Sequence, residues 1–355
     1  MKSSVKTMER GNATRTATRT EPRTRPEAQS YPPRRVLITG GAGFLGVNAA
    51  VHLIERGWHA TILDNLSRRG TERNLKWLIT QHPARTTFIK EDVRNGGALA
   101  EHVRNQDAIL HLAAQVAVTT SLVDPETDFD INARGTLNVL EATRKHNPDA
   151  PLVFASTNKV YGKLDHKSGP CKETQPLDFH SPYGCSKGTA DQYVRDYARC
   201  FHMNTVVLRQ SCIYGAHQYG TEDQGWVAHF VHSILEDRPL TIYGDGLQVR
   251  DLLDARDLSA LYEIAIENID RTRGQIYNVG GGEPNQRNLL EVIDQIGELI
   301  HKTPQYTFTD WREGDQQYYV SDVSKAKQEL GWEPRIQFDR GLRDLVAWAA
   351  SIEPA

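Results

Sequence analysis

The stretch that decides the fold reads Val36-Leu-Ile-Thr-Gly-Gly-Ala-Gly-Phe-Leu-Gly46. A short apolar strand runs into three spaced glycines, and an apolar helical pattern follows them. The first glycine allows a tight turn, the second lets the backbone approach a pyrophosphate, and the third lets the helix lie against the strand. Free amides at the start of the helix attract phosphate groups. The stretch therefore predicts a dinucleotide-binding turn made of Gly40, Gly43, Phe44, Leu45 and Gly46.

A second apolar strand, residues 60–64, ends in Asp64, and Asn65 follows it. An acid at this position can accept hydrogen bonds from both ribose hydroxyls of an adenosine. Arg68 and Arg69 lie where the 2′-phosphate of NADP would sit, but the Asp64 carboxylate would repel that phosphate, so the sequence favours NAD. The alternative is a glycine-rich turn without a ligand. The strand, helix, second strand and terminal acid occur together, which argues against it.

Strands continue to alternate with helices along the chain. The later strands are expected at residues 86–89, 108–112, 151–156 and 204–209, and two long helices at 124–146 and 181–201. This alternation predicts an α/β fold of the Rossmann type, with a doubly wound parallel sheet and helices on both faces. After residue 210 the elements become shorter, as in a smaller C-terminal lobe. The ligand crevice is expected at the carboxyl ends of the strands.

Composition argues against several classes of protein. The chain has 355 residues, a net charge of -3, and four cysteines at positions 171, 185, 200 and 212. The charge argues against a nucleic-acid binder. The cysteines lack metal or redox spacing, which fits reduced thiols in the cytoplasm. No apolar run approaches the roughly 20 residues that a membrane span needs. We therefore expect a cytoplasmic protein that binds no metal, membrane or nucleic acid.

The first 33 residues differ from the rest. They are rich in Thr, Arg, Pro and Ser, as in Asn12-Ala-Thr-Arg-Thr-Ala-Thr-Arg-Thr20, and poor in large apolar groups. Such a segment cannot bury enough apolar surface to offset its chain entropy, so residues 1–33 are predicted to be a disordered basic extension. An anionic partner for its arginines, such as DNA, is an alternative to a dispensable extension or a misassigned start codon.

Three motifs together carry a family resemblance. They are the Gly-x-x-Gly-x-x-Gly pattern of the turn, His111-Leu-Ala-Ala114 at the end of a strand, and Tyr183-x-x-x-Lys187. In this combination the chain resembles the extended short-chain dehydrogenase/reductase family, over roughly residues 34–350. The resemblance implies an NAD-binding domain at 34–210 and a nucleotide-sugar-binding lobe at 211–355, partly interleaved. It also implies cofactor contacts by Asp92, Val93, Ala113 and Ala114, with a structural rather than catalytic His111.

Tyr183 and Lys187 lie four residues apart, so on a helix both side chains leave the same face. A nearby ammonium favours the phenolate form, which predicts a phenol pKa shifted down toward working pH. The phenolate could take a proton from a sugar hydroxyl as hydride leaves the carbon for the nicotinamide. The resemblance implies catalytic roles for Tyr183, Lys187 and Thr157, and contacts from Tyr183 and Lys187 to the cofactor. The alternative is a surface Tyr and Lys on an amphipathic helix.

The residues after Thr157 discriminate between activities. The family's nucleotide-sugar 4,6-dehydratases carry Asp-Glu there, whereas this chain has Asn158 and Lys159. Neither residue can serve as the carboxylic acid, and lysine has the wrong charge to replace the carboxylate. Elimination of water is therefore disfavoured. Reversible oxidation and reduction at one carbon remains, which is epimerisation if the cofactor stays bound.

Four segments favour one group within the family. They are Asn65-Leu-Ser-Arg-Arg-Gly70, Ser156-Thr-Asn-Lys-Val-Tyr-Gly162, Ser211-Cys-Ile-Tyr-Gly215 and Gly220-Thr-Glu-Asp-Gln-Gly-Trp-Val227. Together they look more like the CDP-paratose 2-epimerases (CDP-tyvelose 2-epimerases) than like the UDP-galactose 4-epimerases. The resemblance implies inversion at C2 of a CDP-3,6-dideoxyhexose through a 2-keto sugar. A UDP-hexose 4-epimerase, a nucleotide-sugar 4-ketoreductase and a non-catalytic dinucleotide sensor are the alternatives.

The resemblance also suggests residues that contact a nucleotide-sugar substrate. For each arginine among them, a surface ion pair is an alternative role. The long helices at 124–146 and 181–201 resemble the pair that forms a dimer interface in relatives, which predicts a homodimer or homotetramer, although both helices could instead pack within one chain. The candidate substrate contacts are Gln115, Thr119 and Thr120 for the sugar, Gln224, Gly225 and Arg250 for the diphosphate, Arg312 and Asp315 for phosphate and nucleotide ribose, and Asn158.

Overall fold

The computed structural model describes residue 1, residues 34–164 and residues 169–352. The described residues from 34 onward belong to one compact unit. Apart from Met1, the extension predicted to be disordered lies outside the described residues.

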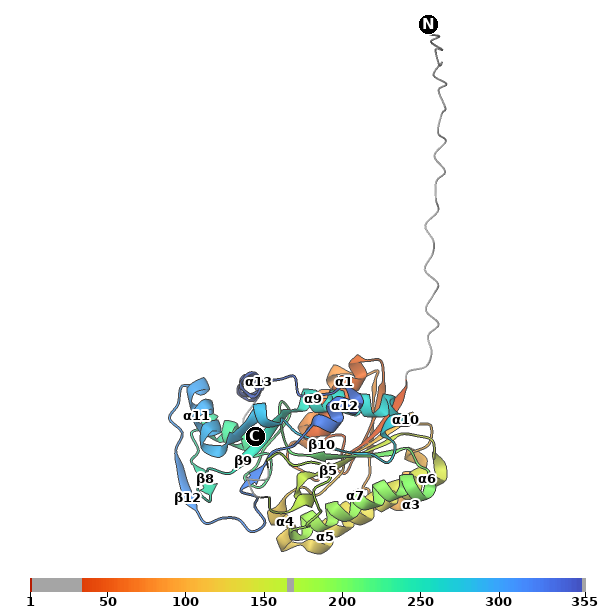
Figure 1. The fold of residues 1–355 in the computed structure, drawn as a ribbon, viewed down its shortest axis with the longest axis horizontal. Helices are drawn as coiled ribbons and strands as arrows, with labels where there is room; N and C mark the ends of the chain where they lie inside the picture. The colour runs from red at the N-terminus through yellow and green to blue at the C-terminus, as the bar shows by residue number, and fades with distance from the viewer. Residues whose placement is uncertain (2–33, 165–168, 353–355) are drawn as a thin grey trace. The chain divides into compact units, whose positions relative to one another are not determined.

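A seven-stranded parallel sheet forms the centre of this unit (Figure 1). Its strand order is β10-β6-β5-β4-β1-β2-β3, so the direction of winding reverses beside β1. This is the order of a Rossmann-type doubly wound sheet, and the predicted fold is confirmed. The strands are β1 (Arg35–Thr39), β2 (His59–Asp64), β3 (Thr86–Lys90), β4 (Ala108–His111), β5 (Leu152–Thr157), β6 (Thr205–Gln210) and β10 (Ile276–Val279).

Helices cover both faces of the sheet (Figure 1). The side chains of the central strands are therefore buried on both sides. Val36 and Ile38 pack toward one group of helices and Leu37 toward the other. The first group is α1 (Phe44–Glu55), α2 (Thr71–Gln81), α9 (Ala255–Glu267) and α12 (Ser324–Leu330). The second group is α3 (Gly96–His102), α6 (Gly135–His146) and α7 (Ser181–Phe201).

The chain beyond residue 210 builds a smaller layer with its own apolar cluster. It also returns to the first sheet, because β10 pairs with β6 and α9 packs against α1. The smaller strands are β7 (Cys212–Tyr214), β8 (Leu240–Tyr243), β9 (Val249–Asp254), β11 (Gln286–Asn288), β12 (Tyr306–Thr309) and β13 (Tyr318–Tyr319). The remaining helices of this part are α8 (Trp226–Leu235), α10 (Ile269–Thr272), the 3₁₀ turn η4 (Glu283–Asn285), α11 (Leu289–Ile300) and α13 (Phe338–Ser351).

The single helix predicted for residues 124–146 is wrong in detail. The chain forms α4 (Val118–Val123), α5 (Pro125–Phe129), a π-helical turn η1 (Asp130–Arg134) and then α6. Asn132 lies in the π turn, where its side-chain amide donates to Gln115 O, Asp128 Oδ1 and Ser186 Oγ. These partners come from other elements, which explains why periodicity alone did not indicate the turn.

A buried ion pair fixes α7 to the sheet. Arg209 on β6 donates two hydrogen bonds of 2.8 and 2.9 Å to Asp191 on α7, and both side chains are almost fully buried. Ser156 Oγ donates to Asp191 Oδ2, and Arg209 also donates to the Tyr161 hydroxyl. Because both side chains are almost fully buried, removal of either charge would leave the other buried and uncompensated.

We therefore expect Asp191→Asn to lower the free energy of unfolding by about 3–5 kcal/mol, since Arg209 would lose its counter-ion in the core. Urea denaturation followed by circular dichroism measures this loss. Glu236→Gln is the matched control, because it removes one charge of the exposed Arg238–Glu236 pair. That change should cost less than about 1 kcal/mol. An equally small loss in Asp191→Asn would contradict this reading of the core.

Candidate active site

The first of two adjoining clefts lies over the carboxyl ends of β1, β2 and β4. Its outline takes in about 1060 Å³ of empty space, open solvent included. The glycine turn lines this cleft. Its backbone is packed so closely that a Cβ at Gly46 would lie 2.5 Å from Gly40 O, so no side chain fits there. The predicted cofactor residues that line it are Gly40, Gly43, Phe44, Leu45, Gly46, Asp64, Asn65, Asp92, Val93, Ala113 and Ala114.

Asp64 is held at the edge of this cleft by backbone amides. Its carboxylate accepts from Ala42 N at 3.1 Å and from Leu66 N at 2.8 Å. Burial raises the pKa of this carboxyl, and these amide hydrogen bonds oppose the rise. The adjacent Asn65 donates to Asp92 Oδ2 at 2.8 Å. Two carboxylates and an amide thus lie side by side, which suits ribose hydroxyls and does not suit an additional phosphate.

Arg68 makes a hydrogen bond that the sequence did not indicate. Its guanidinium donates to Gln224 Oε1 at 2.7 Å, and both residues line the first cleft. Gln224 also lines the second cleft, so this hydrogen bond lies where the two clefts meet. Sequence reasoning missed this contact because 156 residues separate its partners.

The second cleft is lined from both layers of the protein, and its outline takes in about 1400 Å³ of empty space, open solvent included. Thr157 ends β5, and Tyr183 lies in the first turn of α7. Both side chains are largely buried yet line this cleft. A hydrogen bond between them acts to lower the pKa of the Tyr183 phenol. The other predicted substrate residues that line it are Thr119, Asn158, Gln224, Gly225, Arg250, Arg312 and Asp315.

Lys187 lies beneath the cleft rather than in its wall. Its ammonium donates to Ala155 O at 2.6 Å and lies 4.2 Å from the centre of the Phe154 ring. Burial lowers the pKa of this ammonium to about 7. The lysine is therefore poised to gain or lose a proton near neutral pH.

The sequence predicted a lowered pKa for Tyr183, and this prediction is wrong when only the protein's own groups act on the phenol. Burial raises the pKa of the phenol to about 12, against the opposing hydrogen bond from Thr157. Two causes explain the difference. The Lys187 ammonium is directed to Ala155 O, and burial of the phenol outweighs the nearby charges. Spacing on the helix indicated a shared face correctly, but it could not indicate which acceptor the ammonium would choose.

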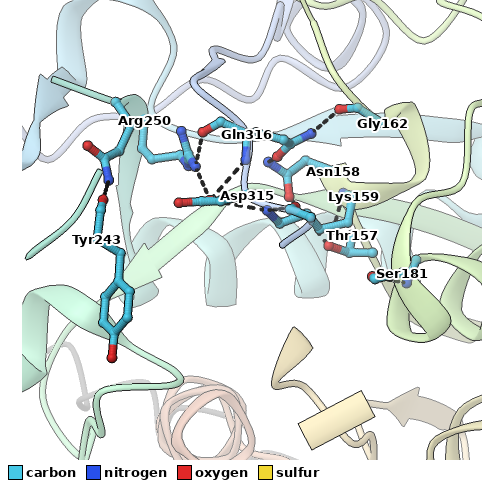
Figure 2. A network of polar contacts seen from close by, with 12 residues as sticks. Thr157, Asn158, Lys159, Gly162, Ser181, Tyr243, Arg250, Asp315 and Gln316 are labelled. Atoms are coloured by element: carbon cyan, nitrogen blue, oxygen red, sulfur yellow. Dashed lines mark hydrogen bonds and ion pairs between the residues drawn. The ribbon is translucent and has the colours of Figure 1, made fainter. Parts of the chain in front are cut away.

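A polar network crosses the second cleft from β5 to the segment before β13 (Figure 2). Arg250 donates to Asp315 Oδ1 at 2.8 Å and also to Gln316 O. Lys159 Nζ lies 3.7 Å from the same carboxylate oxygen. Asn158, beside Thr157, donates to Gln316 Oε1 at 3.4 Å. An amide and an ammonium thus stand at positions 158 and 159, beside the Arg250 guanidinium and the Asp315 carboxylate.

Arg312 forms another part of the cleft wall. Its guanidinium lies 3.7 Å from the centre of the Tyr243 ring and donates to Glu222 Oε1 at 3.1 Å. Thr119 Oγ1 donates to Asp223 Oδ1 on the same loop. Sequence reasoning did not select Tyr243; its position at the end of β8, where strand ends commonly carry ligand contacts, was an available signal.

Two predicted sugar contacts lie elsewhere. Gln115 turns inward, where its amide donates to Ala117 O and Asp128 Oδ1, and it does not line the second cleft. Thr120 is exposed and is also absent from the lining.

His111 is completely buried, with Thr39 and Thr136 hydroxyls at 2.7 and 3.0 Å from its ring nitrogens. This position agrees with a structural role.

Within residues 34–164 and 169–352, together with residue 1, no cluster of three or more His, Cys, Asp or Glu side chains could hold a metal ion. No helix in this described part of the chain is both long enough and apolar enough to cross a membrane.

The sheet order, the glycine turn and the acid at the end of β2 define a Rossmann-type nucleotide-binding protein. A family model described as GDP-mannose 4,6 dehydratase matches residues 37–345. The chain belongs to this family of extended short-chain dehydrogenases/reductases, as its sequence motifs predicted.

The relatives with named activities include both epimerases and dehydratases. A CDP-paratose 2-epimerase from Salmonella typhi is 40% identical, over 90% of this chain and 100% of its own length. A Thermus thermophilus UDP-glucose 4-epimerase, solved in complex with NAD, is 32% identical with a TM-score of 0.80, over 89% of this chain and 99% of that one. A Streptomyces venezuelae dTDP-glucose 4,6-dehydratase, solved with NAD and TYD, is 29% identical with a TM-score of 0.81, over 89% and 97%.

The lowered pKa of Lys187 predicts a pH-dependent stability difference. Below pH 7 the folded protein carries the full penalty of a buried ammonium. Between about pH 7 and pH 10 the folded state releases this proton before the unfolded state does, so the penalty shrinks as pH rises. We therefore measure both proteins free of dinucleotide and subtract the melting temperature of wild type from that of Lys187→Met. This difference should fall steadily from pH 7 to pH 9. Lys163→Met, at an exposed lysine, should show a flat difference. A flat difference in Lys187→Met too would refute the assignment.

Proposed function

We propose that this chain is an NAD-dependent epimerase of a nucleotide sugar. The observation that carries the proposal is the pairing of Tyr183 and Thr157 in one cleft with Asn158 and Lys159, beside a dinucleotide cradle. The first pair suits oxidation and reduction at a hydroxyl-bearing carbon. The second pair lacks the carboxylic acid and carboxylate that elimination of water would need.

NAD fits the first cleft by the chemistry of its donors and acceptors. Amides of the glycine turn would hold the pyrophosphate, and Asp64 would accept from the adenosine ribose. The buried carboxylate would repel a 2′-phosphate, which favours NAD over NADP. When bound, NAD would supply a hydride acceptor that carries a positive charge in its oxidised form.

The side chains of this protein then have distinct roles. Thr157 donates a hydrogen bond to the reacting oxygen and orients it toward Tyr183. Tyr183 would act as a phenolate, accepting the hydroxyl proton on oxidation of the carbon and returning it on reduction from the opposite face. Because burial raises the pKa of the phenol to about 12, this phenolate would need the positive charge of the bound oxidised cofactor. Lys187, whose pKa lies near neutrality, would hold the nicotinamide ribose. Arg250 would contact the diphosphate through the guanidinium N–H groups that Val249 O, Asp315 Oδ1 and Gln316 O do not use.

The proposed reaction is inversion at C2 of CDP-paratose to give CDP-tyvelose through a 2-keto sugar. It is supported by the 40% identity to a CDP-paratose 2-epimerase over nearly the whole chain. The 32% identity to a UDP-glucose 4-epimerase favours a second candidate, a UDP-hexose 4-epimerase. A nucleotide-sugar 4-ketoreductase would have to exchange its cofactor in each turnover, whereas an epimerase would purify with NAD bound.

We also propose that the protein assembles as a homodimer or homotetramer through residues 124–146 and 181–201, which include α5, α6 and α7. In these segments Phe129 is 46% exposed and Phe201 is 49% exposed, and Leu122 and Val123, at the end of α4 just before them, are 45% and 87% exposed. A monomer would leave this apolar surface in water.

The direct test is incubation of the purified protein with CDP-, UDP-, GDP- and dTDP-hexoses, followed by proton NMR. We expect inversion at C2 of CDP-paratose, and release of about one NAD per chain on denaturation, because the same cofactor serves both half-reactions. Inversion at C4 of a UDP-hexose would support the second candidate instead. Net reduction that requires added NADH would contradict epimerisation altogether.

Tyr183→Phe provides the control for the chemical step. It removes only the hydroxyl that exchanges the proton, so turnover should fall by about 10²- to 10⁴-fold while NAD remains bound. Tyr193→Phe is the matched control, because Tyr193 lies on the same helix with 47% exposure, and its turnover should stay within about 3-fold of wild type. Equal activity of the two variants would disprove the role of Tyr183.

A further inference from the structure

Lys159 is a largely buried cation that the proposed proton transfer does not use. It belongs to the 3₁₀ turn η2 (Asn158–Tyr161), and its side chain is 20% exposed in the wall of the second cleft. Its backbone amide donates to Thr157 Oγ1 at 3.2 Å. One short turn therefore fixes Lys159 relative to the hydroxyl that is proposed to orient the reacting oxygen.

The ammonium of Lys159 is incompletely satisfied by the protein. Among the residues that the structure describes, its recorded acceptors are Gly314 O at 3.5 Å and Asp315 Oδ1 at 3.7 Å (Figure 2). The same carboxylate oxygen is held more closely by Arg250, at 2.8 Å, and by the amide of Gln316, at 2.9 Å. Because an ammonium has three donors and both contacts are long, it retains capacity for a ligand.

Two cations share one carboxylate at this point of the cleft, which leaves an excess of positive charge. Burial lowers the pKa of Lys159 to about 8, with the nearby Arg250 as the next cause, while Asp315 opposes both. The lysine is thus still mostly protonated at pH 7. An anion placed between Lys159 and Arg250 would relieve this charge and fill the free donors.

The chemistry of the substrate identifies that anion. A CDP-dideoxyhexose is uncharged in its sugar, so its only anionic groups are the two phosphates. We propose that the Lys159 ammonium binds the phosphate attached to C1 of the sugar, together with Arg250. This proposal rests on the proposed function and deepens it, because it assigns a substrate contact to a residue so far considered only as a replacement for a dehydratase carboxylate.

The contact has a consequence for the position of the reaction. C2 is bonded directly to C1, which carries the phosphate, whereas C4 lies across the sugar ring. Since Lys159 and Thr157 are two residues apart on one turn, a phosphate held by Lys159 brings the C1–C2 edge of the sugar toward Thr157 and Tyr183. Lys159 thereby favours reaction at C2 over reaction at C4.

The test compares CDP with CMP as probes, by isothermal titration of the protein as purified. CMP lacks the phosphate that Lys159 would bind. In Lys159→Met, CDP affinity should fall by about 10- to 100-fold, the range expected for loss of a charge-assisted hydrogen bond, while CMP affinity stays within about 3-fold. Lys159→Arg should recover most of the lost affinity. Lys163→Met, at an exposed lysine shortly after the same turn, should change neither.

A purely structural role would weaken CDP and CMP equally, or neither, and either outcome would overturn the proposal. Lys159→Gln repeats the test if the methionine variant does not fold. The UDP and UMP pair gives the same ratio independently of the base. Failure of the proposed function would appear separately, as absence of C2 inversion by the wild-type protein.

Discussion

The site depends on a contact between backbones that leaves no room for a side chain. A Cβ at Gly46 would lie 2.5 Å from Gly40 O, and one at Gly40 would lie 2.7 Å from Ala113 N. The start of α1, the end of β1 and the segment after β4 therefore meet only because these positions are glycine. The same turn presents Ala42 N to Asp64, so the phosphate cradle and the ribose-binding acid are fixed together.

Burial shifts the pKa values of two groups at the second cleft, and it works against stability. It makes the phenol of Tyr183 harder to ionise and the ammonium of Lys187 easier to neutralise. Both groups are kept in place by α7, which the Asp191–Arg209 pair ties to β6. Because this ion pair anchors α7, the helix can keep the phenol and the ammonium buried although burial disfavours the charged form of each. Such destabilised groups are typical of active sites.

Features set by local steric rules could be predicted from the sequence. The ends of the six strands predicted between residues 36 and 209 agree with the structure to within one residue, and the residues predicted to hold the cofactor's phosphates and adenosine line one cleft. Features that depend on distant partners could not. The π turn at Asn132, the inward turn of Gln115 and the Arg68–Gln224 hydrogen bond all require acceptors from other elements. The pKa of Tyr183 was mispredicted for the same reason, because burial is a property of the whole fold.

The central claim is that one carbon loses hydride and regains it within a single closed site. The most direct measurement starts from CDP-paratose carrying deuterium at C2, incubated with the protein in ordinary water and examined by NMR and mass spectrometry. The account predicts that the CDP-tyvelose formed retains the deuterium at C2, since the hydride never exchanges with solvent. Replacement of that deuterium by solvent hydrogen during inversion would contradict it, because the label would then have left as a proton.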